Sequence, residues 1–301
     1  MRAKAESERA PAPQEFRLLR GALLELRPLP MAAALLIVLL GALWARAALV
    51  PAPPFLPWVL LAVFFGLLAA HLMDSLVDVV KRGDRTPADY PLLFRDSTGV
   101  LRDRDYVPLL AAAAVASGLS TIPVARTAGA VPAFILLCAL ALALAYAPAL
   151  DRTMAGVSLG YPAGACAVFL ASVIAAGGTP DTKVAWMTVA LFAALVGTKV
   201  RADVIDLEDD RKAGKRTVAA AFGARAATVG GYALAIGGLL AAAGAPAVFP
   251  LPTLFALPPI GAAAAFAFTS RMEPLPASMW MAYALLATLG LEVAILSLSG
   301  P

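Results

Sequence analysis

Nine long apolar stretches run along the chain, and they constrain its fold more than any other feature of the sequence. A helix needs about 20 mostly apolar residues to cross a bilayer. Because 61% of the 301 residues are hydrophobic and only 15% are charged, we predict an all-α integral membrane protein, a multi-spanning bundle of about nine transmembrane helices. The stretches lie near residues 29–49, 55–80, 106–124, 129–148, 155–177, 184–207, 226–244, 251–269 and 277–298.

The basic residues set the expected orientation, because cytoplasmic loops of membrane proteins carry an excess of Lys and Arg. Most of the 24 such residues fall before the first stretch or after the second and sixth stretches. The opposite side holds only Arg46, Arg126 and Lys183. We therefore expect a cytoplasmic N-terminus and an external C-terminus in a bacterial-type cytoplasmic membrane. The net charge of +4 is explained by these loops, so no nucleic-acid partner is expected.

The N-terminal residues 1–28 are polar and basic. We expect them to form a partly disordered cytoplasmic segment without a secretory signal. Residues 29–301 are then expected to form a single transmembrane domain.

Two clusters of aspartates occur where apolar stretches end. The second stretch ends in "HLMDSLVDVVKRGDR", in which Asp74 and Asp78 lie four residues apart and so share a helix face. The sixth stretch ends in "DVIDLEDDRKAGKRTVA", in which Asp206 and Asp210 repeat that spacing and Asp203 precedes them. Both stretches run towards the cytoplasm in the predicted topology. Both clusters should therefore emerge on the same side of the membrane.

Carboxylates at membrane depth are costly and suggest a functional site. Mg²⁺ prefers oxygen ligands and typically bridges one or two carboxylates to substrate phosphates. We therefore predict Mg²⁺ as cofactor, with the aspartates as metal ligands: Asp74, Asp78, Asp206 and Asp210. Of these, Asp78, Asp206 and Asp210 are predicted to be catalytic. Basic residues nearby are expected to bind a diphosphate: Arg82, Lys199, Arg201, Lys212 and Lys215. The plainer alternative, acids at helix ends that meet water and pair with Lys or Arg, does not explain why the spacing repeats on one side.

The stretch "DLEDDRKAGKRTVA" at residues 206–219 closely resembles the second aspartate motif of the UbiA superfamily of intramembrane prenyltransferases. The similarity is greatest to the 1,4-dihydroxy-2-naphthoate prenyltransferase branch, which serves menaquinone biosynthesis. The first motif is looser, since Asp74 stands where the family usually has Asn. Smaller similarities are "LRPLP" at 26–30, "YAP" at 146–148 and "LGY" at 159–161.

The resemblance implies a helical bundle around a central cavity and a prenyl diphosphate held through Mg²⁺ by the two motifs. Departure of diphosphate would leave an allyl cation for an acceptor to attack, with an aromatic quinone precursor such as dihydroxynaphthoate as the expected acceptor. We place four further residues around the cavity: His71, Asp203, Tyr146 and Tyr161. A lone histidine is more often simply hydrogen-bonded within a bundle, and tyrosines often anchor a protein at the membrane interface.

Two other functions are consistent with parts of the sequence. A terpene cyclase of the UbiA type would use the same diphosphate chemistry without a second substrate, and the altered first motif fits it. A transporter would also bury charge within helices, but its acids should lie near the bilayer midplane. Here the acids lie at helix ends beside basic loops, so a transporter ranks last. The acceptor, the prenyl length and the oligomeric state cannot be read from the sequence.

Overall fold

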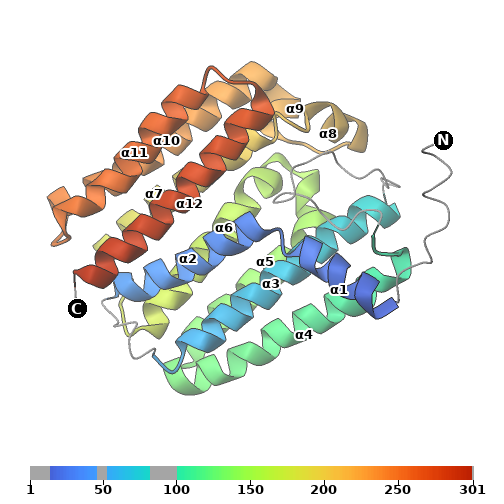
Figure 1. The fold of residues 1–301 in the computed structure, drawn as a ribbon, viewed down its shortest axis with the longest axis horizontal. Coiled ribbons are helices and arrows are strands. Elements are labelled where there is room, and N and C mark those ends of the chain that lie inside the picture. The colour runs from blue at the N-terminus through green and yellow to red at the C-terminus, as the bar shows by residue number, and fades with distance from the viewer. Residues whose placement is uncertain (1–13, 46–52, 82–99, 300–301) are drawn as a thin grey trace, which may run out of the picture.

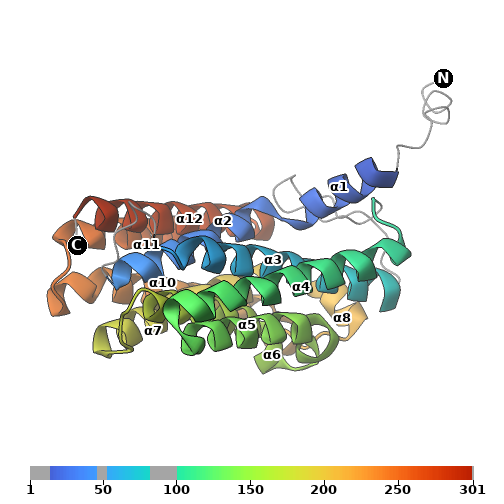
Figure 2. The same cartoon turned by 90° about the horizontal axis from the view of Figure 1, so that it is seen from below.

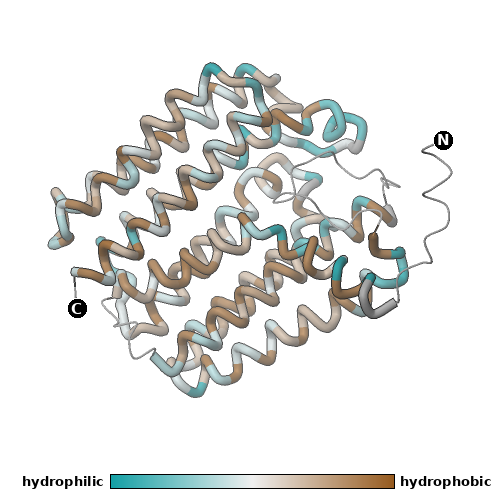
Figure 3. The backbone as a smooth tube through the Cα atoms, in the orientation of Figure 1, coloured by the Kyte–Doolittle hydropathy of each residue, from teal (hydrophilic) through white to brown (hydrophobic). Residues whose placement is uncertain are grey.

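A computed structural model describes residues 14–45, 53–81 and 100–299, and within these ranges the chain is helical without a strand. This confirms the all-α prediction. Figures 1 and 2 show long helices running alongside one another in a bundle. In Figure 3, apolar residues follow the lengths of the helices, while polar residues gather at helix ends, most clearly around α8.

Each of the nine predicted stretches corresponds to one of the main helices. The helices are α2 (Pro28–Trp44), α3 (Leu56–Leu76), α4 (Asp103–Ala128), α5 (Ala130–Ala149), α6 (Met154–Ala175), α7 (Thr182–Ala202), α10 (Ala224–Val248), α11 (Leu257–Thr269) and α12 (Pro274–Leu298). The shorter elements are α1 (Gln14–Glu25), the π-helical turn η2 (Val77–Lys81), η4 (Leu150–Arg152), α8 (Leu207–Ala213), α9 (Val218–Phe222) and η5 (Thr253–Ala256).

The number of membrane spans is close to the predicted nine but not equal to it. By length and composition, seven helices could each cross a membrane alone. An eighth span results if the N-terminal pair Arg17–Glu25 and Pro28–Trp44, bent by 58°, counts as one. The apolar helix at Thr253–Thr269 is shorter than the others. The count of nine is therefore approximate, while the integral membrane class stands.

Small residues bring α7 and α10 into close contact. A Cβ atom on Gly197 would lie 2.3 Å from the backbone nitrogen of Ala235, and one on Gly238 would lie 2.5 Å from the carbonyl oxygen of Ala190. Small residues allow this approach between helices in lipid, where packing rather than hydrophobic burial drives association. The contact fixes α7, and α7 in turn leads directly into the second aspartate cluster.

The predicted sixth stretch, 184–207, ends too late. The helix α7 stops at Ala202, the chain turns through residues 203–206, and α8 begins at Leu207. The extra break separates the aspartates of the second cluster onto a turn and a short helix. Figure 1 shows α1 and α8 at one end of the bundle, and the C-terminal end of α12 at the other.

A candidate active site between two aspartate clusters

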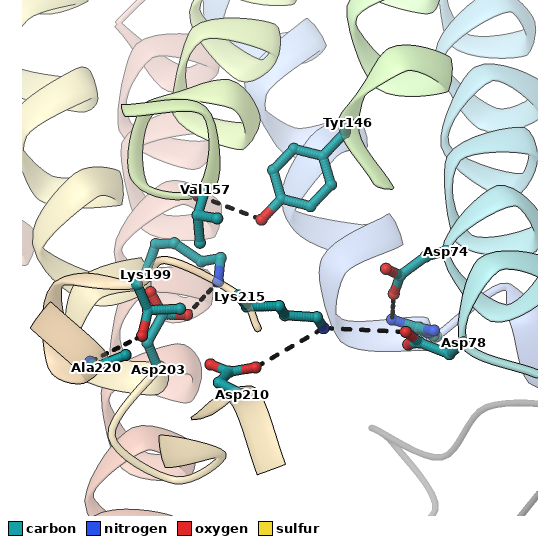
Figure 4. Close-up of polar contacts among 11 residues, drawn as sticks. Asp74, Asp78, Tyr146, Val157, Lys199, Asp203, Asp210, Lys215 and Ala220 are labelled. Atoms are coloured by element: carbon teal, nitrogen blue, oxygen red, sulfur yellow. Dashed lines mark hydrogen bonds and ion pairs between the residues drawn. The ribbon is translucent and has the colours of Figure 1, made fainter. Parts of the chain in front are cut away.

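The first cluster lies where α3 gives way to the π-helical turn η2. Asp74 belongs to the last turns of α3, whereas Asp78 belongs to η2. Such π-helical turns often occur at functional sites. The two carboxylates meet different partners: Asp74 Oδ2 lies 3.4 Å from Arg27 Nη1, and Asp78 faces Lys215 (Figure 4).

The second cluster is arranged around the start of α8. Asp206 is the N-cap residue of α8 and is exposed, and the backbone nitrogen of Asp210 donates to its carbonyl oxygen over 2.7 Å. Asp210 itself is buried. Gly214 ends α8 with a φ of 72°, a left-handed conformation that glycine adopts without strain. This turn brings Lys215 back, so that its backbone nitrogen donates to the carbonyl oxygen of Asp210 over 2.9 Å.

The side chain of Lys215 joins the two clusters. Its Nζ atom lies 4.0 Å from Asp78 Oδ1 and 3.8 Å from Asp210 Oδ1. Figure 4 shows the ammonium group between the two carboxylates. One aspartate from each cluster therefore faces the same ammonium group, although the two aspartates come from distant parts of the sequence.

A second cation belongs to the same neighbourhood. Lys199, near the end of α7, pairs with Asp203 one turn later. The other carboxylate oxygen of Asp203, Oδ2, is buried and finds no hydrogen-bond donor in the described part of the chain. Tyr146, on α5, points into this region and donates to the carbonyl oxygen of Val157 over 3.2 Å (Figure 4).

Burial shapes the charge of the second cluster. Desolvation raises the pKa of Asp210 to about 6, against the opposing effect of Lys215. It also raises the pKa of Asp203, although the Lys199 ammonium acts in the other direction. Carboxylates that are poorly solvated gain most from a cation nearby. The second cluster is therefore suited to a ligand that binds together with a cation.

The residues present fit Mg²⁺ held jointly with a substrate. Asp78 and Asp210 offer oxygen donors to one position, and Asp206 is one turn from Asp210. In the described ranges, no three His, Cys, Asp or Glu side chains come close enough to hold an ion by themselves. Mg²⁺ commonly keeps several waters and uses only one or two carboxylates plus substrate phosphates, so this arrangement matches that metal.

Two of the predicted diphosphate-binding residues lie away from the position between Asp78 and Asp210. Lys212 is 76% exposed and pairs with Asp209 on the outer face of α8. Arg201 is buried against α10, where its guanidinium carbon lies 5.6 Å from the centre of the Tyr232 ring. Arg201 and Lys199 are two residues apart, which turns them to nearly opposite faces of α7. Neither Lys212 nor Arg201 is therefore brought beside Lys215 and the two aspartate clusters in this structure, and their part in binding a diphosphate stays a prediction.

Three further residues that were predicted for the site are not seen to contact the aspartate clusters. His71 Nδ1 donates to the carbonyl oxygen of Glu25 over 2.8 Å, so it bonds within the bundle, as a lone histidine more often does. Tyr161 packs against the main apolar core. Arg82 lies outside the described residues.

Sequence reasoning missed one residue of the site, Arg27. It links α1 to α2 and contacts both Asp74 and Ser75, with Nη2 to Ser75 Oγ at 3.4 Å. Its φ of 43° is the only positive value for a non-glycine residue in the described ranges. Such strain tends to occur at functional sites. The only signal in the sequence was the position of Arg27 inside "LRPLP".

Comparison with known proteins gives both a family and a fold. Residues 34–289 match the UbiA prenyltransferase family. Among solved structures, a UbiA homologue from Archaeoglobus fulgidus bound to DMAPP and Mg²⁺ superposes with a TM-score of 0.64 at 18% identity, covering 90% of this chain and 99% of that one. The same homologue bound to GPP and Mg²⁺ gives 0.64 at 17% identity, covering 91% and 100%.

An apo UbiA homologue from Aeropyrum pernix gives a TM-score of 0.63 at 20% identity and covers 87% of this chain and 97% of that one. At these identities the structural matches establish the fold alone. No curated protein matches the sequence.

Proposed function

The chain belongs to the UbiA prenyltransferase family, and from this membership we propose that it transfers a prenyl group from a prenyl diphosphate to an aromatic quinone precursor such as dihydroxynaphthoate. The reaction takes place in a bacterial-type cytoplasmic membrane, with the site facing the cytoplasm. The excess of basic residues at the α1 and α8 end supports this orientation.

One observation carries the proposal: Lys215 lies between Asp78 and Asp210, at 4.0 Å and 3.8 Å. Two acidic clusters that are far apart in the sequence thus converge beside a cation at the end of an apolar bundle. The Archaeoglobus fulgidus homologue, which shares the fold, was solved with Mg²⁺ and either DMAPP or GPP. A prenyl diphosphate with Mg²⁺ is the ligand class that suits such a site.

Asp78, Asp206 and Asp210 would hold Mg²⁺ together with the diphosphate, and Asp74 would flank them while Arg27 engages one of its oxygens. When bound, the metal supplies Lewis-acid stabilisation of the charge on the leaving diphosphate. Lys215 is placed to move from the aspartates to the phosphate oxygens. Its ammonium group then stabilises charge that grows as the carbon–oxygen bond breaks.

The rest of the reaction depends on the apolar bundle. As diphosphate leaves with the bonding electrons, the allyl carbon becomes cationic. A ring carbon of the acceptor then forms the new carbon–carbon bond, and the ring becomes aromatic again by losing the proton, or the carboxylate as CO₂, that this carbon carried. The aromatic ring of Tyr146 borders the site and can attract the cation. Burial among apolar helices keeps water from quenching it.

The choice of acceptor rests on the motif at residues 206–219, which resembles the menaquinone branch more than other branches. Purified protein would be given Mg²⁺ and a series of prenyl diphosphates, with and without dihydroxynaphthoate, and diphosphate release and lipid products would be measured. Release that requires the acceptor and yields a prenylated ring supports the proposal. Release without acceptor, with a terpene as product, would replace it with a cyclase.

A further inference from the structure

Arg201 is a buried arginine for which the described residues provide no counter-ion. Its side chain lies at the end of α7 and is only 2% exposed. The Nε and Nη1 atoms are both buried, and no group in the described part of the chain accepts a hydrogen bond from them. The guanidinium carbon lies over the Tyr232 ring, 5.6 Å from the ring centre.

Burying an unpaired charge costs free energy, and a guanidinium group cannot avoid that cost by losing its proton. Arginine stays protonated in proteins, whereas a buried carboxyl group can become neutral. An isolated buried charge costs several kcal/mol unless an opposite charge accompanies it. A cation–π contact recovers only part of that cost. Arg201 therefore requires an anion that the described residues do not provide.

The position of Arg201 separates it from the site between the aspartate clusters. Lys199 faces that site, and Arg201 is about 200° further around α7. Gly231 on α10 makes room for it, since a Cβ atom there would lie 3.1 Å from Arg201 Cβ. Tyr232 in turn hydrogen-bonds through its hydroxyl to Thr269 Oγ1 over 3.1 Å, and Thr269 is the last residue of α11. The guanidinium thus lies where α7, α10 and α11 meet.

The surrounding helix ends add positive charge. Arg225 in the first turn of α10 and Arg271 in the turn after α11 are both exposed. The acid on that turn is Glu273, the N-cap residue of α12, and it is exposed as well. In Figure 1 the start of α10 and the turn from α11 to α12 lie at the same end of the bundle as α8. At either end of a membrane-spanning bundle, lipid headgroups and dissolved anions are both within reach of the protein.

We propose that Arg201 and Tyr232 form a second anion site that takes a phosphate group, distinct from the site between the aspartate clusters. The fork of guanidinium N–H donors matches the oxygens of a phosphate. The phosphate belongs either to a lipid headgroup or to a free phosphate ion. The site does not depend on the proposed prenyl transfer.

The test uses full-length protein in a maltoside detergent, which carries no phosphate. Thermal unfolding is measured with inorganic phosphate, with dioctanoyl phosphatidic acid, and with dioctanoylglycerol, the same lipid without its phosphate. Mg²⁺ is left out. For the native protein we expect a phosphate-bearing ligand to raise Tm by about 5 °C at a hundred times its Kd, and dioctanoylglycerol to have no effect. A rise in Tm with phosphatidic acid but not with inorganic phosphate identifies a lipid headgroup as the ligand. A rise with both compounds shows that free phosphate is sufficient.

Two variants assign the response to one site. In Arg201→Met the response should disappear, and Tm without ligand should stay equal or rise, because an unpaired charge is replaced by an apolar chain that can pack on Tyr232. In Lys215→Met, which lacks the cation between Asp78 and Asp210, the response should persist. The exposed Arg216→Gln controls for general surface charge. Equal responses in the native protein and Arg201→Met, or loss of the response in Lys215→Met alone, would overturn the proposal.

Discussion

The Nζ atom of Lys215 lies 4.0 Å from Asp78 Oδ1, although the two residues come from opposite halves of the chain. The same ammonium group lies 3.8 Å from Asp210 Oδ1. Lys215 therefore occupies the position where the two acidic clusters converge. A diphosphate and its metal would approach the same carboxylates, so the charge balance at this point should control substrate binding.

Replacing Lys215 by Met should weaken binding of the prenyl diphosphate. A hydrogen bond to a charged group contributes about 1.5–3 kcal/mol, so we expect KM for the diphosphate to rise about 10- to 100-fold. Lys212→Met is the matched control, because Lys212 lies on the same segment but is exposed and paired with Asp209. Steady-state kinetics on both variants tests this. Similar KM values in the two variants would remove Lys215 from the diphosphate site.

The aspartates should be required for turnover without being required for folding. Asp78→Asn and Asp210→Asn should each lower kcat by about 10³-fold, since several kcal/mol of charge stabilisation would depend on the metal that we propose they hold. Asp209→Asn should have little effect, because that side chain is 82% exposed. Product formation is measured beside thermal unfolding. Near-native activity in a well-folded Asp78→Asn/Asp210→Asn double variant would defeat the metal-site interpretation.

The sequence predicted the helices and the second cluster because both depend on local pattern. Apolar length gives a membrane helix wherever it occurs, and Gly214 ends α8 just before Lys215 by local geometry. The end of α7 was misplaced because the apolar run 184–207 continues past the break at Ala202. Lys199 and Arg201 face different ways because each residue of a helix adds a turn of about 100°. The contacts of Arg27 could not be predicted from the sequence, since they depend on how α1 packs against α3.

Arg27 and Asp74 should stabilise the protein as a pair. Both side chains are partly exposed, at 21% and 29%, and the 3.4 Å contact should therefore contribute only about 0.5–1 kcal/mol. Arg27→Met and Asp74→Asn should each lower the free energy of unfolding, and the double variant should lose less than the sum. Denaturant unfolding of the four proteins measures the coupling. Full additivity would show that the two residues act independently.

The contact between α7 and α10 should tolerate no side chain at Gly197. A methyl group there would meet the backbone nitrogen of Ala235 at 2.3 Å, and overpacking of this kind costs about 1–3 kcal/mol. Because α7 carries Lys199 and leads into α8, Gly197→Ala should reduce activity along with stability. Gly237→Ala is the control, since Gly237 lies on α10 with no atom within 4 Å of a built Cβ, and alanine favours the helix. Thermal unfolding and product formation would be compared for both. If Gly197→Ala were as stable and active as Gly237→Ala, the close approach of α7 and α10 would not be what positions the site.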